Sequence, residues 1–144
     1  MLGKEEIVKN FKARCGKSKF VELCGIRAEK IECGNVVLSM VITEALTNPY
    51  GIAHGGALAT LLDTCIGVTC LSVGKNVVTL SMNTNFLKGA PLNEKVTATC
   101  QLIHQGRTTM VGEAEVVDTK GRLLAKASAT FFVIGKNEMV PEKW

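Results

Sequence analysis

The feature that most constrains the fold is an almost unbroken apolar stretch over residues 57–73 that contains one acidic residue, Asp63. The stretch is short for a membrane span, and a charged side chain inside hydrocarbon is costly, so we expect a core helix and no transmembrane segment. A helix that is apolar nearly all round must be covered by the rest of the chain. The Gly-Gly pair at Gly55 predicts its start, and the glycine in SVGKN predicts its end near Ser72.

The segments before this helix predict part of its cover. Ile7, Val8 and Phe11 fall at helical spacing among charged residues, which predicts a short amphipathic helix over residues 4–13. Residues 20–27 and 31–42 are rich in β-branched side chains and are predicted to be strands, with a turn or bulge at CGN, residues 33–35. A polar loop over residues 43–54 then leads to the apolar helix.

The segment after the helix predicts four antiparallel strands with side chains alternating at period two. HQGR at residues 104–107 and DTKGR at residues 118–122 are predicted hairpin turns. The first strand alternates apolar with polar residues, so its polar side chains are expected to share one face: Thr79, Ser81 and Asn83. Small residues along the last strand let a helix or a second sheet approach closely, and the tail from Gly135 onward gives no clear signal.

Composition sets limits on the class of protein. A chain of 144 residues is long enough for one domain, with 47% hydrophobic and 21% charged residues as in ordinary globular proteins. Its net charge of +4 comes without runs of like charge, which argues against nucleic acid as the main partner but suits a small phosphate-bearing ligand. Six cysteines without a C-x-x-C pair and only two histidines argue against a zinc site. The start lacks the apolar stretch of a signal peptide, so a cytoplasmic protein with reduced thiols is expected.

One stripe of the predicted helix is small and polar, and it has two interpretations. Its members fall at spacings that place them on one face: Gly56, Thr60, Asp63, Thr64 and Gly67. They could form an ordinary solvated face. Three features favour a functional site instead. HGG stands at the helix start, where backbone amides are unpaired. The side-chain amide of Asn48 lies in the loop before the helix, and the next strand carries hydroxyl groups.

These residues carry a resemblance to a known family. The pattern N-x-x-G-x-x-H-G-G-x6-D over residues 48–63 resembles that of PaaI-type thioesterases of the hotdog superfamily, as does VTLSMNTNFLKGAPL after the helix. The resemblance covers residues 20–135. It implies an α+β hotdog fold, a long central helix wrapped by a curved antiparallel sheet, in a single domain over residues 1–144 with an N-terminal helix in residues 1–15 and a C-terminal tail in residues 135–144.

The resemblance also implies roles for individual residues. The backbone N–H of Gly55 would polarise a thioester carbonyl, Asp63 would activate water or attack the carbonyl, and Asn48 would hold the substrate or the water. Thr79 would place the nucleophile, with Ser81 as the alternative because the turn before this strand is short. His54 is expected to orient the loop. The predicted substrate contacts are His54, Gly56, Ser81, Phe86, Lys88, Gly106, Arg107 and Thr108. Among them, Lys88 and Arg107 are the candidate cations for the phosphates of coenzyme A.

The implied activity is hydrolysis of an acyl- or aryl-acetyl-coenzyme A thioester, without a metal or another cofactor. The alternatives are a hotdog module that binds acyl-CoA without turnover and a hotdog hydratase or dehydratase. Gly55 and Asp63 are eight residues apart on one helix, or about 12 Å, so one carbonyl cannot contact both. Either one of them is uninvolved, or the site joins two subunits, as in a homodimer or a homotetramer built of two dimers. The acyl group, and whether Asp63 is base or nucleophile, are left open.

Overall fold

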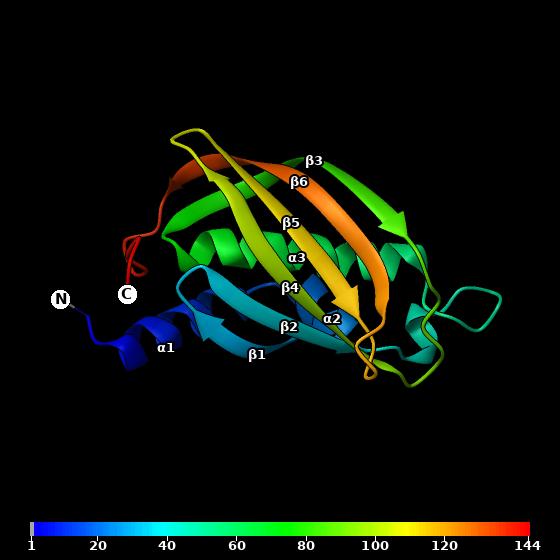
Figure 1. The fold of residues 1–144 in the computed structure, drawn as a ribbon. Helices are drawn as coiled ribbons and strands as arrows, with labels where there is room; N and C mark the ends of the chain where they lie inside the picture. Colours follow the sequence, from blue (N-terminus) through cyan, green and yellow to red (C-terminus); the bar gives the residue numbers. More distant parts are fainter. Residues whose placement is uncertain (1) are drawn as a thin grey trace.

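The long apolar helix is covered by a curved sheet, as its composition requires. The computed structural model describes residues 2–144, and Figure 1 shows the sheet curling over the central helix. Six strands form one antiparallel sheet in the order β1-β2-β4-β5-β6-β3. The elements are α1 (Lys4–Cys15), α2 (Lys19–Cys24), β1 (Arg27–Glu32), β2 (Asn35–Val41), the 3-10 turn η1 (Glu44–Leu46), α3 (Gly55–Ser72), β3 (Lys75–Phe86), β4 (Lys95–Gln105), β5 (Thr109–Val117) and β6 (Leu123–Lys136).

Helix α3 is the core of the protein. It is long and apolar enough to cross a membrane by length and composition alone, but 56% of that 18-residue window is buried within the fold. The sheet approaches it closely through small residues. Ala125, Ala127 and Ala129 of β6 are at most 3% exposed, and a side chain at Gly112 of β5 would lie 2.7 Å from Ile66 of α3. The small residues of the last strand therefore have the role that the sequence predicts.

The segment from Lys19 to Cys24 is helical, and its prediction as a strand is wrong. The Ser18 hydroxyl accepts a hydrogen bond from the backbone N–H of Val21 and caps the helix start. Gly25 has φ of +71° and ends the helix in the left-handed conformation that glycine adopts without strain. These two caps outweigh the β-branched composition. The first strand begins only at Arg27, and the predicted CGN turn separates it from β2.

Strand β3 contains a bulge that corrects a second prediction. Thr79 lies opposite the buried Phe131 of β6, whereas Ser81 lies opposite Thr130, because the register shifts at Leu80. Directly opposed residues of antiparallel strands point to the same face of a sheet. Thr79 therefore points inward, toward α3, while Ser81 and Asn83 point outward. The prediction that these three polar side chains share one face is wrong.

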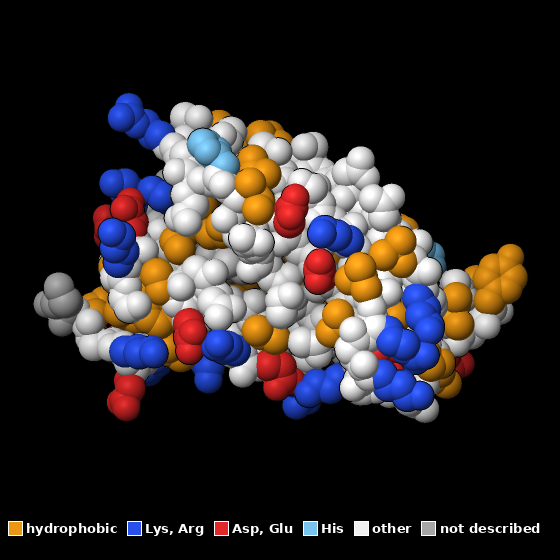
Figure 2. Space-filling model, viewed as in Figure 1, with side chains coloured by type: hydrophobic (Ala, Val, Ile, Leu, Met, Phe, Trp, Pro, Cys, Tyr) orange, Lys and Arg blue, Asp and Glu red, His pale blue; other side chains and the backbone are white. Residues whose placement is uncertain are grey.

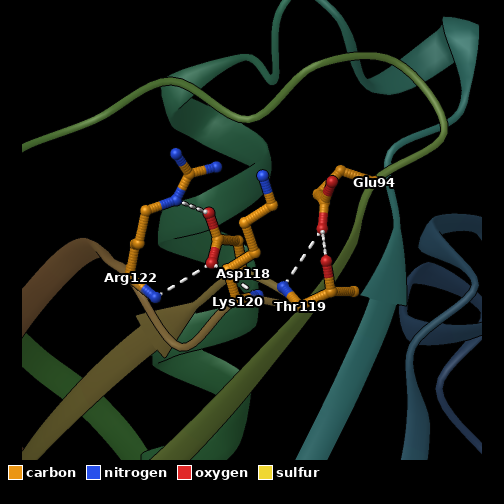
Figure 3. Close-up of polar contacts among 5 residues, drawn as sticks. All are labelled: Glu94, Asp118, Thr119, Lys120 and Arg122. Atoms are coloured by element: carbon orange, nitrogen blue, oxygen red, sulfur yellow. Dashed lines mark hydrogen bonds and ion pairs between the residues drawn. The ribbon is translucent and has the colours of Figure 1, made fainter.

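The surface is of mixed charge, and both predicted hairpin turns are present. On the outer face seen in Figure 2, basic and acidic side chains are interspersed with hydrophobic ones. In the β5–β6 turn, the Asp118 carboxylate accepts bonds from the backbone N–H groups of Lys120 and Arg122 and from Nε of Arg122, at 2.7 to 3.0 Å (Figure 3). Glu94 accepts bonds from the backbone and hydroxyl of Thr119 beside them. These contacts tie the turn to the start of β4.

The C-terminal tail is packed onto the end of α3, although its sequence shows no clear pattern. Val140 is 1% exposed, and the indole N–H of Trp144 donates to the backbone oxygen of Ser72 at 2.7 Å. A side chain at Gly74 would lie 2.7 Å from the backbone oxygen of Val140. The two ends of the chain lie side by side (Figure 1), where Asn10 of α1 donates to the backbone of Met139.

Candidate functional site

Asp63 and Thr79 form a polar pair between the central helix and the sheet. The Thr79 hydroxyl donates to Oδ1 of Asp63 at 2.6 Å. Asp63 lies in the middle of α3 and is partly buried, whereas Thr79 lies on the edge strand β3 and is exposed. The bulge at Leu80 turns Ser81 away from Asp63, so Thr79 and not Ser81 is the hydroxyl that orients this carboxylate.

The N-terminus of α3 presents a backbone donor. His54 caps the helix, and its Nδ1 accepts a hydrogen bond from the N–H of Gly56 at 2.8 Å. This contact agrees with the expectation that His54 orients the loop before the helix. Within residues 2–144 the N–H of Gly55, the first residue of the helix, makes no hydrogen bond. This donor lies at the positive end of an 18-residue helix, where it favours an anion or a developing oxyanion.

Phe86 lies beside this donor. Its ring would be 3.5 Å from a side-chain atom added at Gly55, so it borders the helix start from the end of β3. On β3, Phe86 is opposite the buried Ala125 and points to the same inner face as Thr79. Phe86 thus forms an apolar wall next to the free N–H.

Asn48 shapes the loop that leads into α3. Its Oδ1 accepts bonds from the backbone N–H of Tyr50 at 3.0 Å and of Ile52 at 3.4 Å. Both bonds use the oxygen, so the Nδ2 donors remain without a partner among the residues that the structure describes. The loop returns to the helix start through the bond from the N–H of His54 to the oxygen of Leu46. Asn48 therefore belongs to the Gly55 end of the helix.

These groups form two half-sites within one chain. The first comprises Gly55 with Asn48 and Phe86, and the second comprises Asp63 with Thr79. The helical rise places Gly55 and Asp63 about 12 Å apart along α3. A reacting carbonyl needs both its oxyanion donor and its nucleophile within about 3 Å.

The predicted coenzyme A contacts also lie far apart in one chain. The backbone N–H of Lys88 donates to Leu124 at the start of β6, whereas the oxygen of Thr108 accepts from Val133 near its end. Nine residues of strand correspond to about 30 Å. Gly106 is in the β4–β5 turn beside Thr108, where a side chain would lie 2.6 Å from His104. Arg107 and Lys88 are both exposed, so neither is held in place by burial.

The cysteines offer no competing nucleophile at four of their six positions. Burial raises the pKa of Cys65 and Cys70 to about 12, and that of Cys15 and Cys100 to about 11, from an ordinary value of 9.0. These thiols stay protonated at neutral pH and are unreactive. These four thiols are therefore not candidates for the reacting group.

A long central helix wrapped by an antiparallel sheet, with a polar pair between helix and sheet and a free amide at the helix start, defines a hotdog protein of the thioesterase type. The sequence pattern of the Thioesterase superfamily matches residues 50–125. The chain belongs to this family. The predicted α+β hotdog fold and the resemblance to PaaI-type thioesterases are thus confirmed.

Three known proteins illustrate the similarity. The acyl-coenzyme A thioesterase PaaI of Escherichia coli (strain K12) is 32% identical over 101 residues, which are 70% of this chain and 72% of that protein. The E. coli PaaI structure superimposes with a TM-score of 0.86 at 27% identity over 92% of this chain and 96% of that one. The 1,4-dihydroxy-2-naphthoyl-CoA hydrolase of the same organism is 28% identical over 93% of this chain and 100% of its own length.

The third is a hypothetical thioesterase of Streptococcus pneumoniae TIGR4, solved with coenzyme A. It has a TM-score of 0.76 and 37% identity over 78% of this chain and 88% of that one. Two variants of that protein have also been solved, one with alanine in place of an aspartate and one with alanine in place of a threonine. Those two residues are sixteen positions apart in its chain, which is also the separation of Asp63 and Thr79.

Proposed function

We propose that this chain is an acyl-CoA thioesterase that hydrolyses the thioester of an acyl- or aryl-acetyl-coenzyme A to the free acid and coenzyme A. The observation that carries the proposal is the Asp63 carboxylate, oriented by Thr79 on the inner face of the sheet, in a helix whose first N–H is free. Membership in the thioesterase family supports it, as do a relative named as an acyl-CoA thioesterase and a structural neighbour with bound coenzyme A.

The chemistry needs only these groups and water. The Gly55 N–H donates to the thioester oxygen and stabilises the negative charge that develops there. With Asp63 as the base, the carboxylate takes a proton from water while the water oxygen bonds to the carbonyl carbon. The carbon–sulfur bond then breaks, and the coenzyme A thiolate leaves and takes up the proton. Asn48, through its unpaired Nδ2 donors, holds the substrate or the water.

Asp63 has a second possible role as a nucleophile. In that case its oxygen bonds to the carbonyl carbon, the carbon–sulfur bond breaks and the coenzyme A thiolate leaves, and water then hydrolyses the acyl-enzyme anhydride to the free acid and the Asp63 carboxylate. Rapid quenching followed by mass spectrometry of the intact protein separates the two roles. A mass increase equal to the acyl group, absent in Asp63→Asn, assigns the nucleophile, whereas an unchanged mass during turnover assigns the base.

We further propose that the active site joins Gly55 of one subunit to Asp63 of another in a homodimer. The two half-sites are too far apart to act on one carbonyl, and a two-fold axis supplies two equal complete sites. Strand β3 is at the edge of the sheet, where its outer row of backbone groups has no neighbouring strand within residues 2–144. Val78 and Leu80 on this strand are 47% and 59% exposed.

The register of β3 supports this dimer. If two β3 strands pair about a two-fold axis at Asn83, Met82 is opposite the partner's Thr84, and both point inward. When the bulged Leu80 is skipped, Thr79 falls opposite the partner's Phe86, and these two also point inward. Thr79 contacts Asp63 and Phe86 borders Gly55, so this pairing brings the two half-sites together.

Two dimers could associate through the outer face of the sheet, which is the basis for proposing a homotetramer. Phe132 of β6 lies opposite Val78 and points outward, and it is 42% exposed. A cytoplasmic location is proposed from the chemistry of the cysteines, because all six are free thiols in the structure. Sedimentation at several protein concentrations would test the assembly: a single monomer species at all concentrations contradicts both the dimer and the tetramer.

The test of function is release of coenzyme A thiol from a panel of acyl-CoAs by the wild type, Asp63→Asn and Glu113→Gln. Glu113 is a partly buried carboxylate of β5 that points to the outer face, opposite Ser128, and serves as the matched control. Turnover lost only in Asp63→Asn supports the thioesterase. Tight acyl-CoA binding without turnover favours the non-catalytic binding module, and loss of an enoyl-CoA double bond without thiol release favours the hydratase.

A further inference from the structure

A cavity of about 780 Å³ begins beside the candidate catalytic carboxylate. Thr64, the residue after Asp63, is part of its lining, and so are Gly67, Val68 and Leu71, one turn and two turns further along α3. These positions share one face of the helix and extend the cavity by about 10 Å toward the helix C-terminus. Its volume is within the range of small-molecule binding sites.

The opposite wall is built by the N-terminal helices. Phe11 and Cys15 of α1 and Val21 of α2 face the cavity, and Leu38 of β2, which is 4% exposed, also lines it. The surface of the lining is therefore mostly apolar.

Four of the five charged residues in the lining are exposed. The lining contains four cations, Lys12, Arg14, Arg27 and Lys75, and one acidic residue, Glu22. Lys12, Arg14 and Arg27 are exposed, and Lys75 is paired with Glu142 at 3.0 Å. Long basic side chains can lay their aliphatic stems along an apolar ligand while their charges stay in water. The interior thus suits a ligand without charge along its length.

We propose that this cavity binds the acyl chain of the substrate, that the chain is aliphatic and of medium to long length, and that helices α1 and α2 set the length that fits. The proposal rests on the thioesterase function proposed above. The acyl chain leaves the carbonyl at Asp63 and runs along Val68 toward Leu71, within the subunit that supplies Asp63. An elongated apolar cavity that covers two helical turns is longer than a single aromatic ring requires.

The test compares variants that fill the cavity from its two walls. Val68→Trp places an indole on the α3 wall, and Val21→Trp places one on the α2 wall. Val111→Trp is the matched control, because Val111 of β5 is also partly buried but lies opposite Thr130 on the outer face. Each is made with and without Asp63→Asn, so that both turnover and binding without turnover are measured.

Saturated acyl-CoAs of increasing length are the probes. The KM of the wild type is expected to fall by about fourfold per added methylene until the cavity is full, and the Kd of Asp63→Asn is expected to fall by the same factor. Val68→Trp and Val21→Trp are expected to raise both constants for the long chains by tenfold or more relative to those for acetyl-CoA. The urea unfolding midpoint of each variant separates this effect from a loss of fold. Val111→Trp should change none of these quantities.

The outcomes separate this proposal from the thioesterase function. Binding that improves with chain length and is lost in both filled variants, with no thiol release from any substrate, supports the cavity and rejects the enzyme. Turnover that does not depend on chain length, or that is fastest with aromatic acyl groups, overturns the cavity proposal and leaves the enzyme. Filled variants that lose the dimer but keep the wild-type length profile assign the cavity to the subunit interface, which also overturns it.

Discussion

Replacing Gly55 by proline removes the backbone donor at the start of α3 with little other change. Proline has no N–H, and the first position of a helix is where it is best tolerated. The residue before a proline must be extended, and His54 already is, with φ of −62° and ψ of 136°. A side-chain atom at Gly55 would lie 3.5 Å from Phe86, an ordinary van der Waals contact. We therefore expect Gly55→Pro to fold.

The expected effect is on turnover and not on binding. Loss of one oxyanion donor lowers kcat by about 10²–10³-fold, or about 3–4 kcal/mol. The N–H of Gly55 makes no hydrogen bond in the protein within residues 2–144, so its removal leaves no internal acceptor unsatisfied. Gly55→Ala is the control, because it adds the same first side-chain atom and keeps the N–H. It should retain kcat within a few-fold.

The assay is thiol release, with acyl-CoA affinity and the urea midpoint measured for both variants. Equal kcat in Gly55→Pro and the wild type, with the fold intact, would refute the oxyanion role of this amide. Equal losses in the proline and alanine variants would assign the effect to crowding against Phe86. Either result would remove Gly55 from the proposed site.

The same variant tests the shared site. A random mixture of Gly55→Pro and Asp63→Asn subunits yields half heterodimers, each with one complete site if that site joins two subunits. The mixture then recovers about a quarter of the wild-type activity, because one site in two is complete in half of the dimers. A site within one chain recovers none, and mass spectrometry of the intact dimers confirms that heterodimers have formed.

Four further predictions follow from individual contacts. Asp63→Asn is expected to abolish thiol release and to leave acyl-CoA Kd within a few-fold, and unchanged turnover would remove it from the chemistry. Thr79→Val should lower kcat by about tenfold, because the hydrogen bond to the carboxylate is exposed and so weaker than a buried one, while Thr79→Ser should retain activity. Trp144→Ala is expected to lower the free energy of unfolding by about 2 kcal/mol in urea titrations, and Trp144→Phe by less, since it loses only the hydrogen bond to Ser72. Burial raises the pKa of Asp118, but the hydrogen bonds from the β5–β6 turn outweigh it and lower the pKa below its ordinary value of 3.8. The carboxylate therefore stabilises the fold above that pH, and this contribution is lost as the pH falls through the lower folded-state pKa. Asp118→Asn should lower the free energy of unfolding at pH 7 and change it little at pH 2, and equal effects at both pH values would contradict this assignment.

Local signals in the sequence explain which elements could be predicted. The bounds of α3 follow from HGG at one end, the glycine after Ser72 at the other, and the apolar run between them. The two hairpins follow from turn residues between strands of period two. The helix over Lys19–Cys24 also had local signals, Ser18 before it and Gly25 after it, but composition alone pointed to a strand.

The site residues were predicted mainly from the resemblance, and the structure distinguishes among them. It pairs Thr79 with Asp63 and turns Ser81 away, a choice that depends on one bulged residue in β3. It shows Asn48 bonding its own loop through its oxygen, and it separates Lys88 from Thr108 along β6. Whether these residues contact a substrate stays a prediction.

The sequence by itself determined the elements whose signals are local: a core helix with one carboxylate, its two ends, and a set of alternating strands that must cover it. Only the tertiary structure decided which hydroxyl reaches Asp63, which strand is left at the sheet edge, and where the cavity lies. These features depend on strand pairing and on side chains that are far apart in the chain. A register shift of one residue moves every side chain that follows to the opposite face of the sheet, and the sequence next to the shift contains no signal that predicts it.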